Sequence, residues 1–552
     1  MKRILNVCLL LLVAACSYAQ FESFEEYRKQ LYGNYNSYVD KAQEEYNAFR
    51  KQVNDNYAEF LRQAWEAFDA APADTIHEEQ TLPPVVYQEP QPVVEPTPKP
   101  QPAPQPTPQP EEDLQEPIVR DTTKVAPIKK DSAFLNVKPV KPDSVPIDVK
   151  IPVAPPKPIQ IPIEENVVVV TPPTPAPEPI APVQPKEEQQ TEKVTITYYN
   201  TPITISFPVP DGLKLTALKE NAIAEAWKEL ADAKYDITVK TALDARKNNA
   251  LCDWAYMQVL QQLTEKKYGD TNEAVLMQAF LMTQSGYSIR LGMDTKKLYM
   301  LVASQYNIYN LRYFTIDNTR FYMVKGDCDN MQICKAKFDK EKSMSLQLQH
   351  LPMLNIALSD KRTLTSKKGV TAVVSVNKNM IDFFDKYPVS CINGDFTTRW
   401  VAYANTPLDK AVKKNLYPVL QKTVEGMSEK DAVGIILNWV QTAFVYGYDD
   451  EVWGGDRAFF AQETLYYPYS DCEDRAILFS RLVRDILGLD VALLYYPGHL
   501  AAAVAFKTDV NGDYLICQNK KYVVCDPTYI NAPVGRTMPN MDNKQAKVII
   551  LK

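Results

Sequence analysis

This chain of 552 residues has no excess of basic charge, few histidines and no long apolar run. The 61 lysines and arginines are outnumbered by 68 aspartates and glutamates, and the net charge of -7 gives no reason to expect a nucleic-acid partner. The chain has three histidines, and Cys328 and Cys334 lack a second pair, so no spacing indicates a metal site and we expect no cofactor. The apolar stretch at residues 4–15 is too short to span a bilayer.

That stretch has the features of a secretory signal instead. Basic residues 2–3 precede it, and Ser-Tyr-Ala at 17–19 offers a cleavage site before Gln20. We therefore expect residues 1–19 to be removed and the mature protein to be exported, to the periplasm or the cell envelope. Val-Ala-Ala-Cys at 13–16 also fits a lipobox, in which case Cys16 becomes a lipid anchor at the new terminus. Both alternatives stay open.

Residues 20–71 carry an aromatic pattern with a period of eleven. One series is Phe24, Tyr35, Tyr46, Tyr57 and Phe68, and a second is Tyr27, Tyr38, Phe49 and Phe60. Eleven residues over three turns is about 3.67 per turn, which predicts a long, nearly straight amphipathic helix of the coiled-coil type. Such a helix alone would expose too much apolar surface. We expect it either to self-associate through residues 21–71 or to fold back on the globular part.

A proline-rich tract at residues 72–192 follows and holds most of the 42 prolines. This composition cannot bury a core, so we expect a disordered, extended linker. Because such a linker does not transmit packing, removal of residues 20–71 should leave the globular part folded.

The most informative cysteine is Cys472, in the run Ser-Asp-Cys-Glu-Asp at residues 470–474. Ser470 and Asp471 are good N-caps, and apolar residues at helical spacing predict a helix over 473–487 that Gly488 ends. Free amides in the first turn favour a thiolate at Cys472, whereas the charges of Glu473 and Asp474 oppose one.

A histidine and an aspartate follow at the ends of predicted strands. His499 begins a strand after the turn at 497–498, and Asp526 ends a later hairpin just before Pro527. His499 is the only histidine after His350, so a base for Cys472 has no nearby rival. Alternatively, Cys472 is a buried structural thiol and Asp526 caps a turn.

These three residues, in this order, resemble the transglutaminase-like superfamily. The resemblance implies a papain-like α+β fold over residues 406–552, in which Cys472 attacks, His499 acts as base and then acid, and Asp526 orients the imidazole. Gln462, in the stretch that resembles the lead-in to the family's cysteine, is the candidate oxyanion donor besides the Cys472 amide.

Residues 193–405 predict an accessory α+β domain that opens with a hairpin around Asn200. Its residues 270–291 align with 472–493 at an offset of 202, so that Asp270 replaces Cys472 and Lys297 replaces His499. We interpret this as a degenerate transglutaminase-like repeat without chemistry, and chance similarity of two amphipathic helices as the alternative.

Two functions fit these observations. The first is an exported cysteine hydrolase or acyltransferase that acts on amide bonds in a protein or peptide substrate, with peptide or isopeptide cleavage favoured over cross-linking. The second is an envelope-tethered scaffold or binding protein of the same fold without turnover. Seven cysteines remain after removal of residues 1–19, and this odd number suits a free reactive thiol, although other disulfides stay open.

Overall fold

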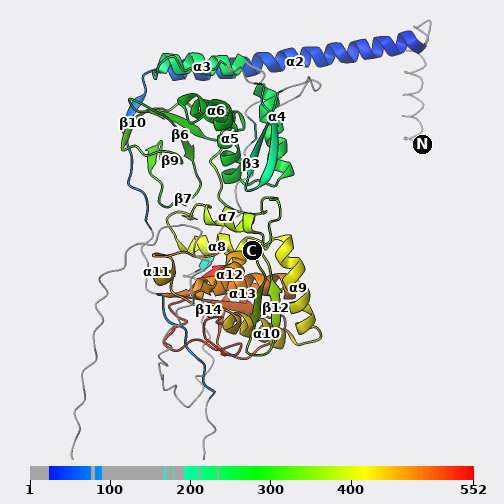
Figure 1. The fold of residues 1–552 in the computed structure, drawn as a ribbon, viewed down its shortest axis with the longest axis vertical. Coiled ribbons are helices and arrows are strands. Elements are labelled where there is room, and N and C mark those ends of the chain that lie inside the picture. Colours follow the sequence, from blue (N-terminus) through cyan, green and yellow to red (C-terminus); the bar gives the residue numbers. More distant parts are fainter. Residues whose placement is uncertain are drawn as a thin grey trace, which may run out of the picture. The chain divides into compact units, whose positions relative to one another are not determined.

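The computed structural model describes residues 24–75, 81–89, 167–169, 178–179, 192–208, 212–232 and 235–551. The predicted signal, Cys16 and most of the predicted linker lie outside these ranges. The chain divides into an N-terminal unit, residues 1–74 with 174–346, and a C-terminal unit, residues 75–173 with 347–552 (Figure 1). Each unit combines helices with antiparallel sheet, so the protein is mixed α and β. Within the described ranges, no helix combines the length and apolar character needed to cross a membrane.

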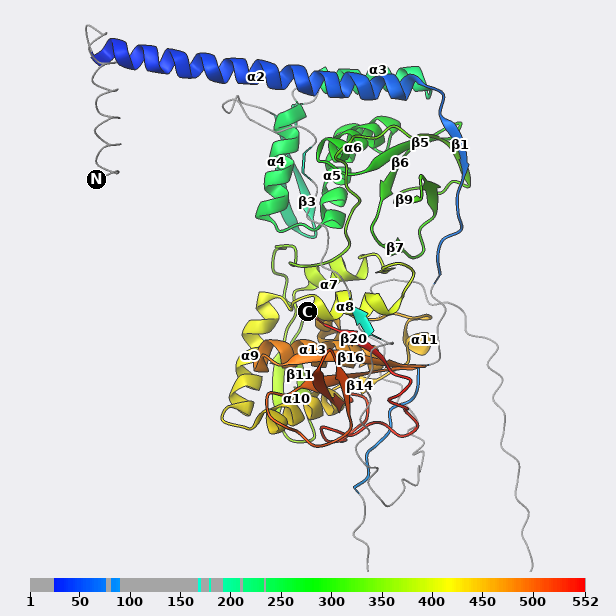
Figure 2. The ribbon, with the colours of Figure 1, turned by 180° about the vertical axis from the view of Figure 1, so that it is seen from behind.

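Helix α2 (Phe24–Arg62) enters the core of the N-terminal unit at its end and lies along α3 (Glu220–Asp232), as Figures 1 and 2 both show. Tyr57 is 3% exposed, and its ring lies 4.5 Å from Phe338 and 4.6 Å from Trp227. Buried Asn54 accepts hydrogen bonds from Trp227 Nε1 and Gln284 Nε2. Tyr57 of the first aromatic series therefore faces the core, whereas Phe49 and Phe60 of the other series are half exposed.

The helix is shorter than the predicted 20–71. It ends at Arg62, and β1 (Glu66–Asp69) then pairs antiparallel with β10 (Asn330–Cys334) at a sheet edge. Pairing with β10 satisfies backbone hydrogen-bonding groups of residues 66–69. Phe68 therefore belongs to a strand and not to the predicted aromatic series of the helix. The expectation that residues 20–71 are separable from the globular part is thus wrong.

The N-terminal unit is a six-stranded sheet with helices. Its strands lie in the order β1-β10-β5-β6-β9-β8. Their bounds are β5 (Ile289–Met293), β6 (Leu298–Ala303), β8 (Tyr313–Ile316) and β9 (Thr319–Met323), with β7 (Asn307–Ile308) outside this sheet. The remaining helices are α4 (Tyr235–Asn248), α5 (Asp253–Tyr268) and α6 (Asn272–Gln284). The predicted opening hairpin is present as β3 (Lys193–Tyr198) and β4 (Thr201–Ser206), with Tyr199 and Asn200 at positive φ in its two-residue turn.

The C-terminal unit contains a second six-stranded sheet, in the order β18-β19-β17-β16-β20-β2. Its strands are β2 (Val167–Val169), β16 (Asp490–Tyr496), β17 (His499–Ala505), β18 (Tyr514–Cys517), β19 (Lys520–Cys525) and β20 (Lys547–Ile550). Helix α13 (Cys472–Leu487) packs on β16 and β17 and ends at Gly488 in the left-handed conformation. This agrees with the predicted helix, stop signal and two following strands.

Residues 347–405 belong to the C-terminal unit, so the boundary lies at 346/347 and not at the predicted 405/406. The segment contains β11 (Arg362–Thr365), β12 (Thr371–Val374), α7 (Lys378–Asp385), β13 (Ser390–Cys391) and α8 (Thr397–Asn405). Long-range contacts hold it there. β12 packs on α9 (Lys410–Val424), and Trp439 Nε1 donates to Leu364 O from α10 (Glu429–Ala443). The unit is completed by β14 (Val445–Tyr446), α11 (Asp449–Val452), α12 (Ala461–Tyr466) and β15 (Tyr469–Ser470).

Five strands of the two sheets share their order and directions. β10-β5-β6-β9-β8 matches β20-β16-β17-β19-β18, and all neighbours are antiparallel. Ile289 pairs with Val302, and Val491 pairs with Val504, each residue lying 202 positions later. A helix, α6 or α13, precedes and packs on the central hairpin in both. The edge strands differ, because β1 is antiparallel and β2 parallel to its neighbour.

Two pieces of the predicted linker are ordered parts of the C-terminal unit. β2 adds to the sheet beside β20. Residues 81–89 form an extended segment in which Val86 bridges to Ile530. Both pieces satisfy their backbone groups on strands or loops of the unit, which a composition-based prediction of disorder does not foresee.

Candidate active site

Cys472 is the first residue of α13 and is 2% exposed. Its Sγ donates a hydrogen bond to Glu473 Oε2 over 3.1 Å. The neighbouring carboxyl thus holds the thiol in its protonated form. All seven cysteines of the described residues are free of disulfides.

The pKa of the Cys472 thiol is raised well above its ordinary value. Burial is the largest cause, followed by the negative charges of Glu473 and Asp471. The amide of Leu500 acts in the opposite direction through a hydrogen bond to the thiol. The sequence set the helix N-terminus, which lowers the thiol pKa, against acidic neighbours, which raise it. In the structure the acidic neighbours, together with burial, have the larger effect on the pKa of Cys472.

His499 and Asp526 form a buried pair where β17 begins and β19 ends. His499 Nε2 lies 2.9 Å from Asp526 Oδ2, and each residue is 2% exposed. The other ring nitrogen, Nδ1, is buried with no hydrogen-bond partner among the described residues. If Nε2 donates to the carboxylate, Nδ1 carries the lone pair, which is the state that a general base requires.

The loop after Asp526 fixes that carboxylate. Asp526 Oδ1 accepts from the amides of Thr528 and Tyr529 at 2.8 and 3.1 Å, while Oδ2 faces the histidine. Gln441 on α10 donates through Nε2 to the carbonyls of Asp526, Tyr529 and Ala532. Sequence reasoning missed Gln441. A buried amide between apolar helical positions is its only signal in the sequence.

Cys472 lies in a cluster of buried aspartate and glutamate side chains. Asp449 has its pKa raised to about 10 by burial and by the charges of Glu473 and Asp474. Burial and Glu473 also raise the pKa of Asp471 and Asp474 well above normal. Both carboxylate oxygens of Asp471 are buried without a hydrogen-bond partner among the described residues.

Two groups of these side chains could offer ligand atoms to a cation, since the atoms within each group lie within 4.8 Å of one another. One is Asp471, Cys472 and Glu473, and the other is Asp449, Asp456 and Glu473. Asp456 is already held by both terminal nitrogens of Arg399. No histidine joins either group.

Arg475 is the buried cation nearest in sequence to Cys472. It donates to Ser470 Oγ and to the carbonyls of Gln441 and Phe444. Burial lowers its pKa to about 10, so it remains charged at neutral pH. Its guanidinium also lies over the ring of Tyr446, at 5.3 Å. Arg475 therefore connects the first turn of α13 to the end of α10.

Gln462, the predicted oxyanion donor, is engaged elsewhere. Its Nε2 donates to Asp409 Oδ2 at 2.8 Å and its Oε1 accepts from the Asp409 amide at 3.0 Å. Asp409 is the N-cap of α9. We therefore assign Gln462 to the support of that helix start and not to the oxyanion.

The corresponding positions of the N-terminal unit also lie together. The alignment places Asp270 at Cys472 and Lys297 at His499. Leu301 pairs with Met323 where Ala503 pairs with Val524, which places Lys325 at Asp526. Lys325 Nζ donates to Asp270 Oδ1 at 2.5 Å, and this hydrogen bond, with the charges of Lys325 and Lys297, lowers the pKa of Asp270. Without a thiol or an imidazole, this ion pair has no group for acyl transfer.

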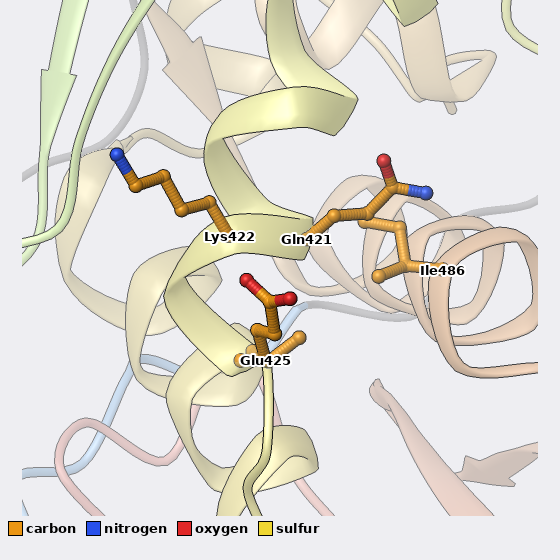
Figure 3. Close-up of a pocket in the computed structure, with 5 residues that line it drawn as sticks. Gln421, Lys422, Glu425 and Ile486 are labelled. Carbon is orange, nitrogen blue, oxygen red and sulfur yellow. The ribbon is translucent and has the colours of Figure 1, made fainter.

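A surface pocket of about 550 Å³ lies apart from these residues. It is lined by Gln421, Lys422, Val424, Glu425 and Ile486 at the ends of α9 and α13. Figure 3 shows Gln421 and Ile486 side by side, with Lys422 on the other side of the helix. The lining contains no thiol, hydroxyl or imidazole, so we do not assign the proposed chemistry to this pocket.

Comparison with protein-family models, with curated proteins and with solved structures returned no match.

Proposed function

We propose that this protein is a cysteine-dependent hydrolase or acyltransferase that acts on amide bonds of peptides or proteins. The observation that carries the proposal is the buried His499 Nε2 to Asp526 Oδ2 contact of 2.9 Å, which leaves Nδ1 unpaired. The residue after His499, Leu500, offers its amide to the Cys472 thiol. A thiol and an oriented imidazole on adjacent elements are the groups that nucleophilic catalysis by cysteine requires.

The proposed reaction follows from these groups. The thiol hydrogen, which Glu473 Oε2 accepts in this structure, must first turn to His499 Nδ1. Cys472 Sγ then gives its proton to Nδ1 and attacks the amide carbon, and Asp526 stabilises the resulting imidazolium through Nε2. The imidazolium then protonates the leaving amine, and a thioester remains on Cys472. Water completes hydrolysis, whereas an amine completes acyl transfer. The Cys472 amide at the helix start is the available oxyanion donor.

Turnover on a protein substrate tests the proposal. Casein serves as the probe, with new amino groups reporting hydrolysis and incorporation of fluorescent cadaverine reporting transfer. Cys472→Ser and His499→Ala should each lower the rate by about 10³-fold or more. Cys328→Ser, in the N-terminal unit, is the matched control and should keep the full rate. Equal rates for the protein and Cys472→Ser would contradict the proposal.

The second candidate is a binding or scaffold protein of similar fold without turnover. The raised pKa of Cys472 favours it, because a buried neutral thiol is a poor nucleophile. Under this alternative, neither the unaltered protein nor any of the variants above hydrolyses or labels casein.

The papain-like assignment of the C-terminal unit and a common origin of the two units are parts of the same proposal. The shared strand order and the 202-residue register support them. Export, lipid attachment at Cys16 and self-association through residues 21–71 remain proposals from the sequence.

A further inference from the structure

An extended segment of the proline-rich region, residues 81–89, is bound to the C-terminal unit at two points. At the first point, the Leu82 amide donates to Gly498 O over 2.9 Å, and Tyr446 Oη donates to Leu82 O over 3.1 Å. At the second, the Tyr87 amide donates to Ile530 O and the Ile530 amide donates to Val85 O, both over 2.8 Å. This is the hydrogen-bond pattern of a peptide added as a strand.

The two points flank His499 and Asp526 in the sequence. Gly498 immediately precedes His499, and Ile530 lies four residues after Asp526. Tyr446 pairs with Ser470, two residues before Cys472, through the short strands β14 and β15. The segment therefore contacts elements beside the nucleophile, the base and the orienting acid.

Side chains of the segment alternate between the protein and solvent. Val85 and Tyr87 pack against the buried cluster of Tyr529, Ala532 and Met538, whereas Val86 between them is 55% exposed. The Tyr87 ring meets Tyr529 edge-on at 5.7 Å, and the Arg536 guanidinium lies over it at 5.7 Å. These contacts define a site that holds two side chains, those of Val85 and Tyr87, next to the backbone groups of Ile530 that bind the segment.

Pro83 and Pro84 connect the two points. Proline has a fixed φ and no amide hydrogen, so this stretch loses little conformational freedom when bound and leaves no donor unsatisfied. Because the segment belongs to the same chain, its effective concentration at the site is high, and weak intrinsic affinity suffices to hold it.

We propose that residues 81–89 are an internal peptide ligand of the active site, and we call the surface that they occupy, formed by Tyr446, Gly498, Tyr529 and Ile530, the groove. The groove then binds extended peptides by their main chain, with apolar and aromatic side chains at the positions of Val85 and Tyr87, and the internal segment must leave before such a peptide enters. The inference rests on the proposed function for its substrate class. The proposal predicts that release of the segment raises the accessibility of Cys472 and His499, which are each 2% exposed with the segment in place.

Alkylation of Cys472 tests the proposal without turnover. Full-length protein is treated with iodoacetamide at pH 8.5, and the rate at Cys472 is read by peptide mass spectrometry, because Cys252 and Cys328 are partly exposed and also react. Tyr87→Ala should raise the Cys472 rate about tenfold, through loss of its ring contacts. Val86→Ala is the matched control on the same segment and should leave the rate unchanged.

A synthetic fluorescent peptide with the sequence of residues 81–89, Thr-Leu-Pro-Pro-Val-Val-Tyr-Gln-Glu, provides the second measurement. It should bind Tyr87→Ala but not the unaltered protein, and excess peptide should slow alkylation of Tyr87→Ala again. A scrambled peptide should do neither. This rescue separates an opened groove from a damaged fold, because an unfolded variant would not regain protection.

Equal Cys472 rates for Tyr87→Ala and Val86→Ala, or no peptide binding to Tyr87→Ala, would overturn the internal-ligand proposal. Neither readout depends on catalysis. A further outcome separates the two proposals. If the peptide protects Cys472 but Cys472→Ser does not change casein turnover in the Tyr87→Ala background, the groove is confirmed and the enzymatic function is contradicted.

Discussion

At the scale of single residues, Glu473 controls the state of the candidate nucleophile. It accepts a hydrogen bond from the Cys472 thiol and places a negative charge beside it, and both effects raise the thiol pKa. Asp526, in contrast, is directed by two amides toward His499. One carboxyl therefore suppresses the thiolate while another prepares the base. The charge at position 473 is the feature most open to a direct test.

Glu473→Gln should lower the pKa of Cys472, since it removes a negative charge next to a buried thiol. In the unaltered protein, the rate of Cys472 alkylation should continue to rise beyond pH 9, the ordinary thiol value, because the pKa is raised. In the variant the pH profile should shift downward by about one unit, which is about tenfold in rate at pH 8. Site-resolved alkylation between pH 6 and 10 measures both profiles.

Glu451→Gln provides the control for that prediction. It makes the same change of charge at an exposed position on α11. Its alkylation profile should match that of the unaltered protein. Coincident profiles for Glu473→Gln and the unaltered protein would mean that Glu473 does not set the thiol pKa.

At the scale of elements, α2 has two aromatic series with different environments. Tyr57 is buried against Trp227 and Phe338, whereas Phe60, three residues later, is 49% exposed. The end of this helix therefore belongs to the core of the N-terminal unit. The half-exposed Phe49 and Phe60 are the surface that a self-association of α2 would use.

Tyr57→Ala should destabilise the N-terminal unit by about 3–5 kcal/mol, the usual cost of emptying a buried aromatic site. For a unit of this size, that corresponds to a fall of roughly 6–20 °C in its unfolding temperature. Phe60→Ala makes a similar aromatic-to-alanine change on the same helix and should shift the transition by less than about 2 °C. Differential scanning calorimetry compares the two, and similar shifts would contradict the docking of α2.

At the scale of the whole molecule, the chain contains two sheets of the same topology, of which one carries a thiol and an imidazole. In the other, Asp270, Lys297 and Lys325 occupy the corresponding positions, and Lys325 binds Asp270 at the surface. The two frameworks share their packing but not these polar side chains, because packing depends on the apolar positions of the helix and of the central hairpin.

Asp270→Asn should leave both the alkylation rate of Cys472 and casein turnover unchanged. The reason is that the N-terminal unit offers no nucleophile at this position and the ion pair it loses is exposed. Initial rates and site-resolved labelling, compared with those of His499→Ala, measure this. A large loss of turnover in Asp270→Asn with normal Cys472 labelling would assign the N-terminal unit a direct role in substrate handling.

The local elements around the candidate site could be predicted from short stretches of the amino-acid sequence. Periodicity and Gly488 predicted α13, the turn at 497–498 placed His499 at the start of β17, and the Asp526-Pro527 turn placed the acid at the end of β19. The 202-residue offset likewise matches the pairing of the two central hairpins. These features depend on caps, turns and apolar spacing within about twenty residues, which a single sequence displays.

The contacts between distant segments could not be predicted from the sequence and are visible in the folded protein alone. The tertiary structure ended α2 at Arg62 and made β1 an edge strand, and it attached residues 81–89 beside His499. It also directed Gln462 to Asp409 and raised the pKa of Cys472. Burial, edge pairing and the electrostatics of buried groups are sums over contacts between residues far apart in the chain, so composition and local pattern do not contain them.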